Sequence, residues 1–237
     1  MRVCLDARCV GPVRTGHGRY ESELIRALAG IDKDNEYIVI RRNGHPGTVV
    51  DQTNFTEVRL PGNQPSLRNL SMGAWRIGRL QADIYHSLHQ FLPFGISRRA
   101  VATLHDLFRI EHPELIHSGL LARTATRAIQ VRDTIAIPSS LRRADHVISV
   151  SRYSADRAED RLKIDPDRIT VIPHGVNDQF LNAGVLSTPE TVEADSEPYF
   201  VMVGDSTRHK NVHGAIDALG LLANRFPDVA LRVIGNG

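Results

Sequence analysis

Short runs of apolar residues recur along the first three quarters of the chain, and most are continuous instead of alternating with polar positions. Continuous runs of this length are typical of strands that are buried on both faces of a parallel sheet. We expect strands at Val3–Ala7, Tyr37–Ile40, Asp83–Ser87, Val101–His105, His146–Val150 and Ile169–Pro173.

Helical patterns lie between these expected strands. Apolar residues recur at helical spacing from Tyr20 to Leu28, and Gly30 follows as a stop signal. Residues 120–141 have a helical pattern as well, which we expect Pro138 to interrupt. Strands and helices in alternation predict right-handed βαβ units and therefore an α/β fold with a Rossmann-like, doubly wound parallel sheet.

A polar segment follows this pattern, from Asn182 to Pro198. It contains no aromatic residue and several acidic ones, so it cannot bury much surface and we interpret it as an interdomain linker. One further βαβ unit follows, with the pattern strand 199–203, loop 205–211, helix 214–224 and strand 229–234. We predict a first domain at 1–182, a linker at 183–198, and at 199–237 the start of a second Rossmann-like domain that is too small to be stable by itself.

The composition excludes several classes of protein. A hydrophobic share of 41% suits a globular core, and the apolar runs are far shorter than the roughly 20 residues of a membrane helix. A net charge of +2 gives little indication of nucleic-acid binding. Asp6 interrupts the N-terminus where a signal peptide would be apolar, so we expect a cytoplasmic protein in which Cys4 and Cys9 are reduced.

Ligands of open parallel sheets bind beyond the carboxyl ends of the strands, so polar residues there are candidates for a site. Gly16 and Gly18 flank His17 ahead of the first helix, where backbone amides can approach a ligand or simply make a tight turn. His86 closes the third strand and His89 follows three residues later. No cysteine or acidic pair completes a metal-ligand set around them, so we expect no metal.

Two further strand ends carry candidates. His105 could exchange a hydrogen bond with a sugar or phosphate, or serve as a structural histidine, and Asp106 could fix its tautomer or the adjacent turn. Ser151 is suited to cap the helix that follows it, with ligand contact as a second role. His174 precedes Gly175 at the domain junction, which we interpret mainly as a hinge.

A basic turn follows the strand expected at 199–203. Arg208 and Lys210 lie just before a helix, so positive side chains and backbone amides meet at one strand end, as a diphosphate requires. An exposed basic turn without a ligand has the same sequence. Only three of the 29 basic residues are lysines, which favours the phosphate role for Lys210.

These segments, in this order, resemble the retaining glycosyltransferases of the GT-B fold, specifically glycosyltransferase family 4 (glycosyl transferases group 1). The matching segments extend nearly end to end and are Thr15–Tyr20, Ala82–Ser87, Leu104–Leu107, Val147–Ser151, Ile169–Asn177 and Val203–Asn211. Each is degenerate by itself, but six in the correct order are hard to obtain by chance.

The resemblance implies a nucleotide-sugar donor held by the C-terminal domain, an acceptor held by the N-terminal domain, and no cofactor. By position, Gly16 and Gly18 would approach the donor phosphates, and His105 would contact the transferred sugar. Lys210 would neutralise the leaving diphosphate with help from Arg208, while His17, His86, Asp106 and Ser151 would be further sugar or acceptor contacts. Many relatives have an arginine where this chain has Asp205, which puts a double basic clamp in doubt.

The implied reaction moves a hexose-type sugar to a glycan or lipid-linked acceptor with retention at the anomeric carbon. Relatives carry two glutamates, seven residues apart, beyond the position of Gly237, so we expect the 237-residue piece alone to be inactive and part of a longer chain. The alternatives are a glycan-binding or partner-binding module with a vestigial second domain and, less favoured, an epimerase or phosphorylase of the same fold.

The resemblance also raises the question of membrane binding, because many relatives act on lipid-linked acceptors. Residues 67–80, which include Arg68, Trp75 and Arg79, could lie on a lipid headgroup surface at the inner face of the membrane. Their apolar residues fit a core-facing helix equally well.

Overall fold

The structure is a computed structural model, which describes residues 1–12, 15–62, 66–97, 99–115, 123–177, 180–181, 198–204 and 208–235. The chain divides into two compact units, one made of residues 1–107 and 133–175 and the other of residues 108–132 and 176–237. The linker expected at 183–198 lies outside the described residues except for Pro198, so the expected domain boundaries stay a prediction.

The first unit is built on a seven-stranded parallel sheet with the order β3-β2-β1-β4-β5-β6-β7. This order, which runs outward in both directions from β1 and β4, confirms the doubly wound sheet predicted from the sequence. Its strands are β1 Arg2–Asp6, β2 Glu36–Arg42, β3 Phe55–Leu60, β4 Ile84–Ser87, β5 Arg99–Leu104, β6 His146–Ser149 and β7 Ile169–Val171.

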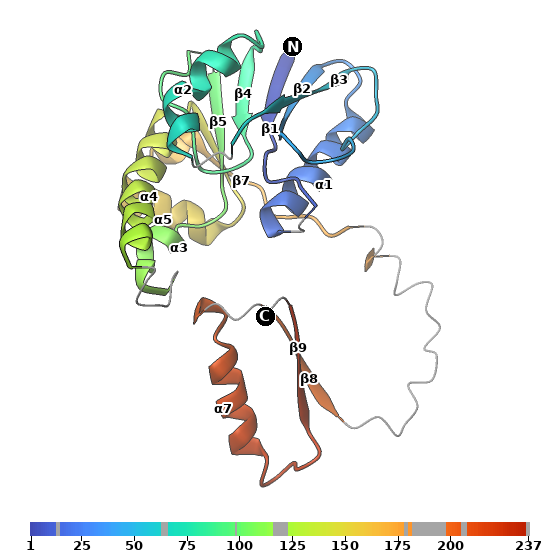
Figure 1. Cartoon of the computed structure of the whole chain (residues 1–237), viewed down its shortest axis with the longest axis vertical. Helices are drawn as coiled ribbons and strands as arrows, with labels where there is room; N and C mark the ends of the chain where they lie inside the picture. The colour runs from blue at the N-terminus through green and yellow to red at the C-terminus, as the bar shows by residue number, and fades with distance from the viewer. Residues whose placement is uncertain are drawn as a thin grey trace. The chain divides into compact units, whose positions relative to one another are not determined.

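Helices connect these strands. They are α1 Gly16–Ile31, α2 Leu67–Gly78, α4 Arg123–Arg143 and α5 Arg152–Leu162, with a 3₁₀ turn, η2, at Pro166–Arg168. α1 lies on one side of the strands, and α4 and α5 lie on the other (Figure 1). Because right-handed crossovers that run in opposite directions from the sheet centre reach opposite faces, the strand order itself requires this arrangement.

The core between α1 and the sheet is made of apolar side chains that the continuous runs had indicated. Leu5, Ile25, Tyr37, Val39 and Leu88 are buried together there. The register pairs Leu5 with His86 and with Val39, so His86 projects on the same face of the sheet as this core. His86 is therefore placed in the layer between the sheet and α1.

One expectation about an element was wrong, and one strand was not expected. Pro138 does not interrupt its helix, since α4 continues to Arg143. Ala136, Ile137 and Leu141 are buried around it, and this packing outweighs the backbone hydrogen bond that proline cannot donate. β3 was not predicted, because at the edge of the sheet its side chains are half-buried or exposed and no continuous apolar run marks it.

The second unit contains the βαβ unit that the sequence predicted. β8 Tyr199–Val203 and β9 Ala230–Ile234 pair in parallel and are connected through α7 Val212–Leu222, with a 3₁₀ turn, η3, at Arg208–Lys210. A short helix α3 Phe108–Glu111 and a 3₁₀ turn, η1, Pro113–Leu115 belong to this unit as well. Among the described residues of α7 none is buried.

Candidate active site

Four histidines gather in the first unit beyond the carboxyl ends of its strands. His17 stacks on His89 with ring centroids 4.8 Å apart and meets His105 edge-on at 4.5 Å. His105 and His174 lie 6.0 Å apart. Tyr20 contacts both of them, at 4.9 Å from His105 and 5.0 Å from His174. We call these five residues the imidazole cluster.

The chain brings these residues together from distant positions in the sequence. His17 and Tyr20 lie in the first turns of α1, whereas His89 follows β4 and His105 follows β5 directly. His174 comes three residues after the end of β7. Since the carboxyl ends of parallel strands share one edge of a sheet, the fold places all five at the edge where open α/β sheets bind ligands.

His105 is held from two directions. Its Nε2 donates to the Leu88 carbonyl oxygen at 3.0 Å, and its own carbonyl accepts from Ser154 Oγ at 3.1 Å. Burial lowers the pKa of His105 to about 4, with His17 and His174 acting in the same direction. The ring is therefore neutral near pH 7 and leaves Nδ1 as an acceptor nitrogen, suited to a hydroxyl group.

His89 has the opposite arrangement of its ring nitrogens. Nδ1 accepts from the Gln90 backbone N–H at 2.9 Å, so the proton of the neutral ring is on Nε2. The proton of His89 is thus on the opposite ring nitrogen from the one that His105 leaves as an acceptor.

The two glycines expected ahead of the first helix lie within the first turn of α1, and their surroundings differ. The Gly18 N–H donates to Thr15 Oγ1, the N-cap, at 3.1 Å, and a Cβ at Gly18 would lie 2.5 Å from the Cys9 carbonyl oxygen. Gly18 is thus required for packing and its amide is already used. Gly16 is exposed, and a Cβ there would meet no atom within 4 Å, which leaves its backbone open to a ligand.

A buried polar network supports the loop between β1 and α1. Arg8 donates to both carboxylate oxygens of Asp6 and, at 2.8 Å, to Asn69 Oδ1 of α2, while Tyr85 OH donates to Asp6 at 2.6 Å. The buried carboxylate of Glu21 accepts from the Cys9 N–H at 2.9 Å and the Val10 N–H at 3.1 Å. These bonds fix residues 8–10, in the segment that leads from β1 to the start of α1 at Gly16 and His17.

The remaining candidates of the first unit are placed as follows. His86 is buried and bonds through Nε2 to Thr103 Oγ1 at 2.9 Å, so it lies beneath the cluster and not on its surface. Ser151 caps α5 by accepting from the Ser154 N–H at 3.1 Å, which is the capping role predicted for it. Asp106 is exposed, and the Leu88 carbonyl fixes the His105 tautomer in its place.

Arg208 and Lys210 form an exposed turn in the second unit, directly before α7. The Lys210 side chain passes over Gly204, where a Cβ would lie 3.4 Å from its Cβ and Cγ. Asn211 at the start of α7 makes no side-chain capping bond, so the first amides of α7 are left for solvent or a ligand. This is the arrangement an anion requires at a helix N-terminus. Asp205 lies outside the described residues.

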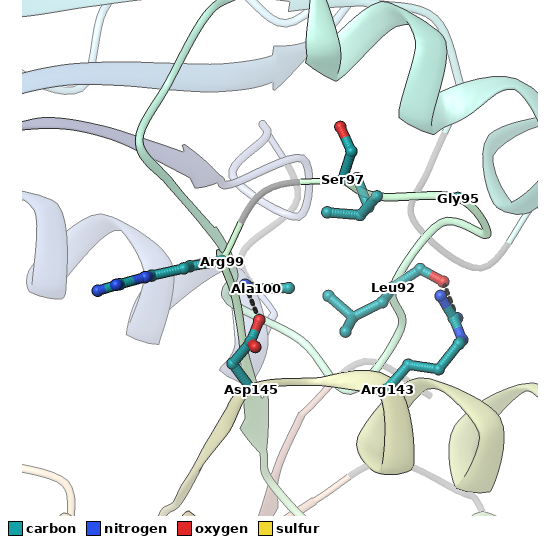
Figure 2. A pocket seen from close by; sticks show the side chains of 8 residues that line it. Leu92, Gly95, Ser97, Arg99, Ala100, Arg143 and Asp145 are labelled. Carbon is teal, nitrogen blue, oxygen red and sulfur yellow. Dashed lines mark hydrogen bonds between the residues drawn. The ribbon is translucent and has the colours of Figure 1, made fainter.

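A separate pocket of about 540 Å³ opens at the opposite edge of the sheet, beside the amino end of β5 (Figure 2). Two of its polar side chains are already engaged, since Arg143 donates to the carbonyls of Leu92 and Pro93, each at 2.9 Å, and Asp145 accepts from the Ala100 N–H at 2.7 Å. The Arg143 bonds tie the segment around Leu92 to α4, and the Asp145 bond ties β5 to the residue that precedes β6. The pocket offers no arrangement of groups comparable with the imidazole cluster.

In the parts of the chain that the structure describes, no three histidine, cysteine, aspartate or glutamate side chains are arranged to hold a metal ion. Of the helices described, none combines the length and hydrophobicity needed to cross a bilayer.

Sequence reasoning selected His17 and His105 but not the whole cluster. His89 was considered as a metal ligand, His174 as a hinge and Tyr20 as part of a helix face. The signal that unites them is their position just beyond the carboxyl end of a strand or at the start of the helix that follows one.

Solved structures share this fold at low sequence identity. The chain superimposes on a glycosyltransferase from Rickettsia africae (TM-score 0.54, 16% identity, 99% of this chain and 68% of that one). It also matches WaaG, a glycosyltransferase involved in lipopolysaccharide biosynthesis (0.64, 15%, 98% and 62%). An E. coli trehalose-6-phosphate structure bound with UDP-2-fluoro glucose matches as well (0.59, 13%, 98% and 64%). The chain thus spans between 62% and 68% of these three structures.

These likenesses establish the GT-B type of α/β fold that the sequence predicted. No curated protein matched the chain. The sequence itself matches the profile of Glycosyltransferase Family 4 over residues 14–180, which is well over half of its length and includes the whole imidazole cluster. The chain therefore belongs to glycosyltransferase family 4.

Proposed function

We propose that this chain is part of an enzyme that transfers a hexose-type sugar, such as mannose or glucose, from a nucleoside-diphosphate donor to a glycan or lipid-linked acceptor. The imidazole cluster carries the proposal, since the acceptor nitrogen of His105 and the ring faces of the cluster lie at the edge of the sheet where ligands bind. Membership of family 4 and a structural neighbour bound with UDP-2-fluoro glucose support a nucleotide sugar as donor.

In the proposed reaction the bond between the anomeric carbon and the diphosphate oxygen breaks, and an acceptor hydroxyl forms the new bond on the same face. Because attack and departure occur on the same face, the configuration is retained, and the acceptor's proton passes to the departing phosphate. His105 accepts a hydrogen bond from a hydroxyl of the transferred sugar through Nδ1. Lys210 and Arg208 stabilise the negative charge on the leaving diphosphate.

The backbone at Gly16 is the second contact proposed for the donor phosphates, because its surroundings leave space for a ligand. Gly18, His86 and Ser151 act through packing and hydrogen bonds within the protein. No metal or other cofactor is part of the proposal. The proposed site of action is the cytoplasm, at the inner face of the membrane where the acceptor is lipid-linked.

Isothermal titration of the full-length protein against a panel of nucleoside diphosphates tests the donor part of this proposal. One of them should bind, and Lys210→Ala should weaken it about tenfold or more, because a hydrogen bond to a charged group contributes about 1.5 to 3 kcal/mol. Arg225→Ala removes a positive charge from the same unit beyond the end of α7 and should leave the affinity unchanged.

The same protein is then assayed for sugar transfer from the corresponding nucleotide sugar, with the anomeric configuration of the product read by NMR. Transfer with retention supports the proposal. A protein that binds a glycan but no nucleoside diphosphate would instead be the binding module with a vestigial second domain, and the proposed function would be wrong.

A further inference from the structure

Three aromatic side chains form a stacked row that leads from the interior of the first unit to the imidazole cluster. Phe91 is 2% exposed and His89 is 9% exposed, whereas His17 is half-buried. The Phe91 and His89 rings are stacked with centroids 5.1 Å apart, and the His89 and His17 rings are stacked with centroids 4.8 Å apart. Both separations fall in the range of about 4.5 to 7 Å that aromatic pairs prefer. We call these three rings the aromatic stack.

The inner end of the aromatic stack is held by hydrogen bonds to the backbone around Phe91. Ser87 Oγ donates to the Phe91 carbonyl oxygen at 2.8 Å, and the Leu92 N–H donates to Ser140 Oγ of α4 at 2.9 Å. Ser87 and Ser140 are fully buried, so these bonds do not compete with water. Because protein interiors are close-packed, a ring as buried as Phe91 on such a backbone is a fixed support.

The middle ring is oriented by its own segment of chain. The Gln90 N–H donates to Nδ1 of His89 at 2.9 Å, and Gln90 is 2% exposed, so its backbone amide needs a partner inside the protein. This bond ties the His89 ring to the backbone that follows it and limits the rotation of the side chain. It also gives a reason for histidine at this position, since an aliphatic side chain has no acceptor for the amide.

The same segment of chain holds His105. The carbonyl oxygen of the buried Leu88 accepts from His105 Nε2 at 3.0 Å. At the outer end of the aromatic stack, the His17 ring meets the His105 ring at an interplanar angle of 81°. Residues 88–91 therefore act on His105 in two ways, through the Leu88 carbonyl and through the stack that ends in His17. With Nε2 fixed, the His105 ring can still tilt about that bond, and the His17 ring limits this tilt.

We propose that Phe91 and His89 are positioning residues, whose stack with His17 holds the His105 ring in the orientation in which Nδ1 receives a hydroxyl of the sugar. The role of His105 toward a sugar rests on the proposed function, whereas the aromatic stack is a property of the unliganded protein. Phe91 acts through His89, and His89 acts through His17.

Carbon-13 NMR relaxation of the histidine rings in the unliganded chain tests this inference. Order parameters report how firmly each ring is held, and unlike chemical shifts they do not respond directly to the loss of a neighbouring ring current. Phe91→Leu removes one ring of the stack but keeps an apolar side chain. The order parameters of the His17 and His105 rings should then fall by about 0.1 to 0.2, part of the difference between rigid and flexible sites.

Phe94→Leu is the matched control for this variant. Phe94 lies in the same connection between β4 and β5, but it is 46% exposed and the Arg143 guanidinium lies 4.6 Å from the centre of its ring. It is therefore outside the aromatic stack, and its replacement should leave the order parameters of the His17 and His105 rings unchanged.

Two substitutions at position 89 separate the effect of a flat ring from that of side-chain volume. His89→Leu should lower the order parameters of the His17 and His105 rings at least as much as Phe91→Leu. His89→Phe keeps a flat ring between its neighbours and should recover most of that loss. Phe91→Leu combined with His89→Leu should lower the His17 value no further than His89→Leu alone, because Phe91 acts through residue 89.

Four outcomes would each overturn the proposal. They are unchanged order parameters in folded Phe91→Leu, an equal loss in Phe94→Leu, equal values in His89→Phe and His89→Leu, and additive losses in the double variant. If Phe91→Leu fails to fold, the two variants at position 89 decide the result.

Activity separates this inference from the proposed function. In the active full-length enzyme, Phe91→Leu should lower kcat about tenfold or more with the donor KM little changed, because the aromatic stack orients a group and does not bind the donor. His89→Phe should recover most of the kcat that His89→Leu loses. The NMR experiment needs no substrate. An enzyme without sugar transfer therefore refutes the proposed function, whereas unchanged ring order in folded Phe91→Leu refutes the positioning role.

Discussion

At the scale of single residues, similar sequence signals turn out to have different physical causes. Gly16 and Gly18 form one Gly-x-Gly motif, yet Gly18 is needed because the Cys9 carbonyl occupies the space of its side chain, whereas Gly16 has no neighbour there. The two positions can therefore be separated experimentally.

Substitution by alanine should affect the free energy of unfolding differently at the two glycines. Gly18→Ala forces a methyl group to within 2.5 Å of the Cys9 carbonyl oxygen, so we expect a loss of about 1 to 3 kcal/mol in the free energy of unfolding. Gly16→Ala should leave that free energy equal or raise it by up to about 1 kcal/mol, since alanine favours the helix. Urea unfolding measures both.

Ligand affinity should distinguish the two glycines as well. Gly16→Ala should weaken the binding of the nucleoside diphosphate that titration identifies, because the added methyl group occupies the side on which the ligand approaches. Equal stability of Gly18→Ala and the wild-type protein would contradict the packing role of Gly18. Unchanged affinity in Gly16→Ala would remove Gly16 from the donor site.

At the scale of elements, α2 has two different faces. One fits the interpretation as a core-facing helix, and the other fits the interpretation as a lipid-binding segment. Leu70 and Ile77 are buried against the first unit, as a core-facing helix requires. Met72 is 47% exposed and Trp75 is 63% exposed, and the Arg79 guanidinium lies 5.1 Å from the Trp75 ring. Between Leu67 and Gly78 the helix has no acidic residue. An exposed face of this kind suits an anionic lipid surface.

We expect the protein to sediment with vesicles that contain phosphatidylglycerol more strongly than with neutral vesicles, and less as salt is raised. Trp75→Ala should weaken this binding about tenfold or more, since burying a large apolar side chain contributes on the order of 1.5 to 3 kcal/mol. Ile31→Ala, which changes another exposed apolar residue at the end of α1, is the matched control. Equal loss in both variants, or no sedimentation, would exclude α2 as a lipid-binding surface.

At the scale of the whole molecule, the sequence predicted the parts that local patterns determine. Six of the seven strands of the large sheet were expected close to their observed positions, because strands buried on both faces leave continuous apolar runs. The edge strand β3 leaves no such run. The continuation of α4 through Pro138 could not be predicted either, because it depends on tertiary packing around Ile137 and Leu141.

The candidate site was predictable only in part for a related reason. His105 could be selected because it follows a strand directly. Its contacts with His17, His89 and His174 depend on the order β1-β4-β5-β6-β7, which brings together residues far apart in the sequence. The hydrogen bond between His86 and Thr103 depends on strand register, which no local pattern specifies.

The two units differ in how much of their apolar surface they bury, and this difference should govern their stability. β1 and β5 contain fully buried residues such as Leu5 and Leu104, whereas in the second unit Val203 is 76% exposed and Leu221 is 86% exposed. Since local stability follows buried apolar contacts, the β8–β9 pair should open at much lower free energy than the large sheet.

Hydrogen exchange of the 237-residue chain measures this difference within one molecule. We expect the amides of β8 and β9 to exchange at least about a hundredfold faster than those of β1 and β5, which corresponds to opening free energies about 3 kcal/mol apart. Leu221→Ser should change neither rate if the exposed face of α7 meets only solvent. Equal protection of both sheets, together with its loss in Leu221→Ser, would instead show that this apolar face is covered in solution and that the second unit is as stable as the first.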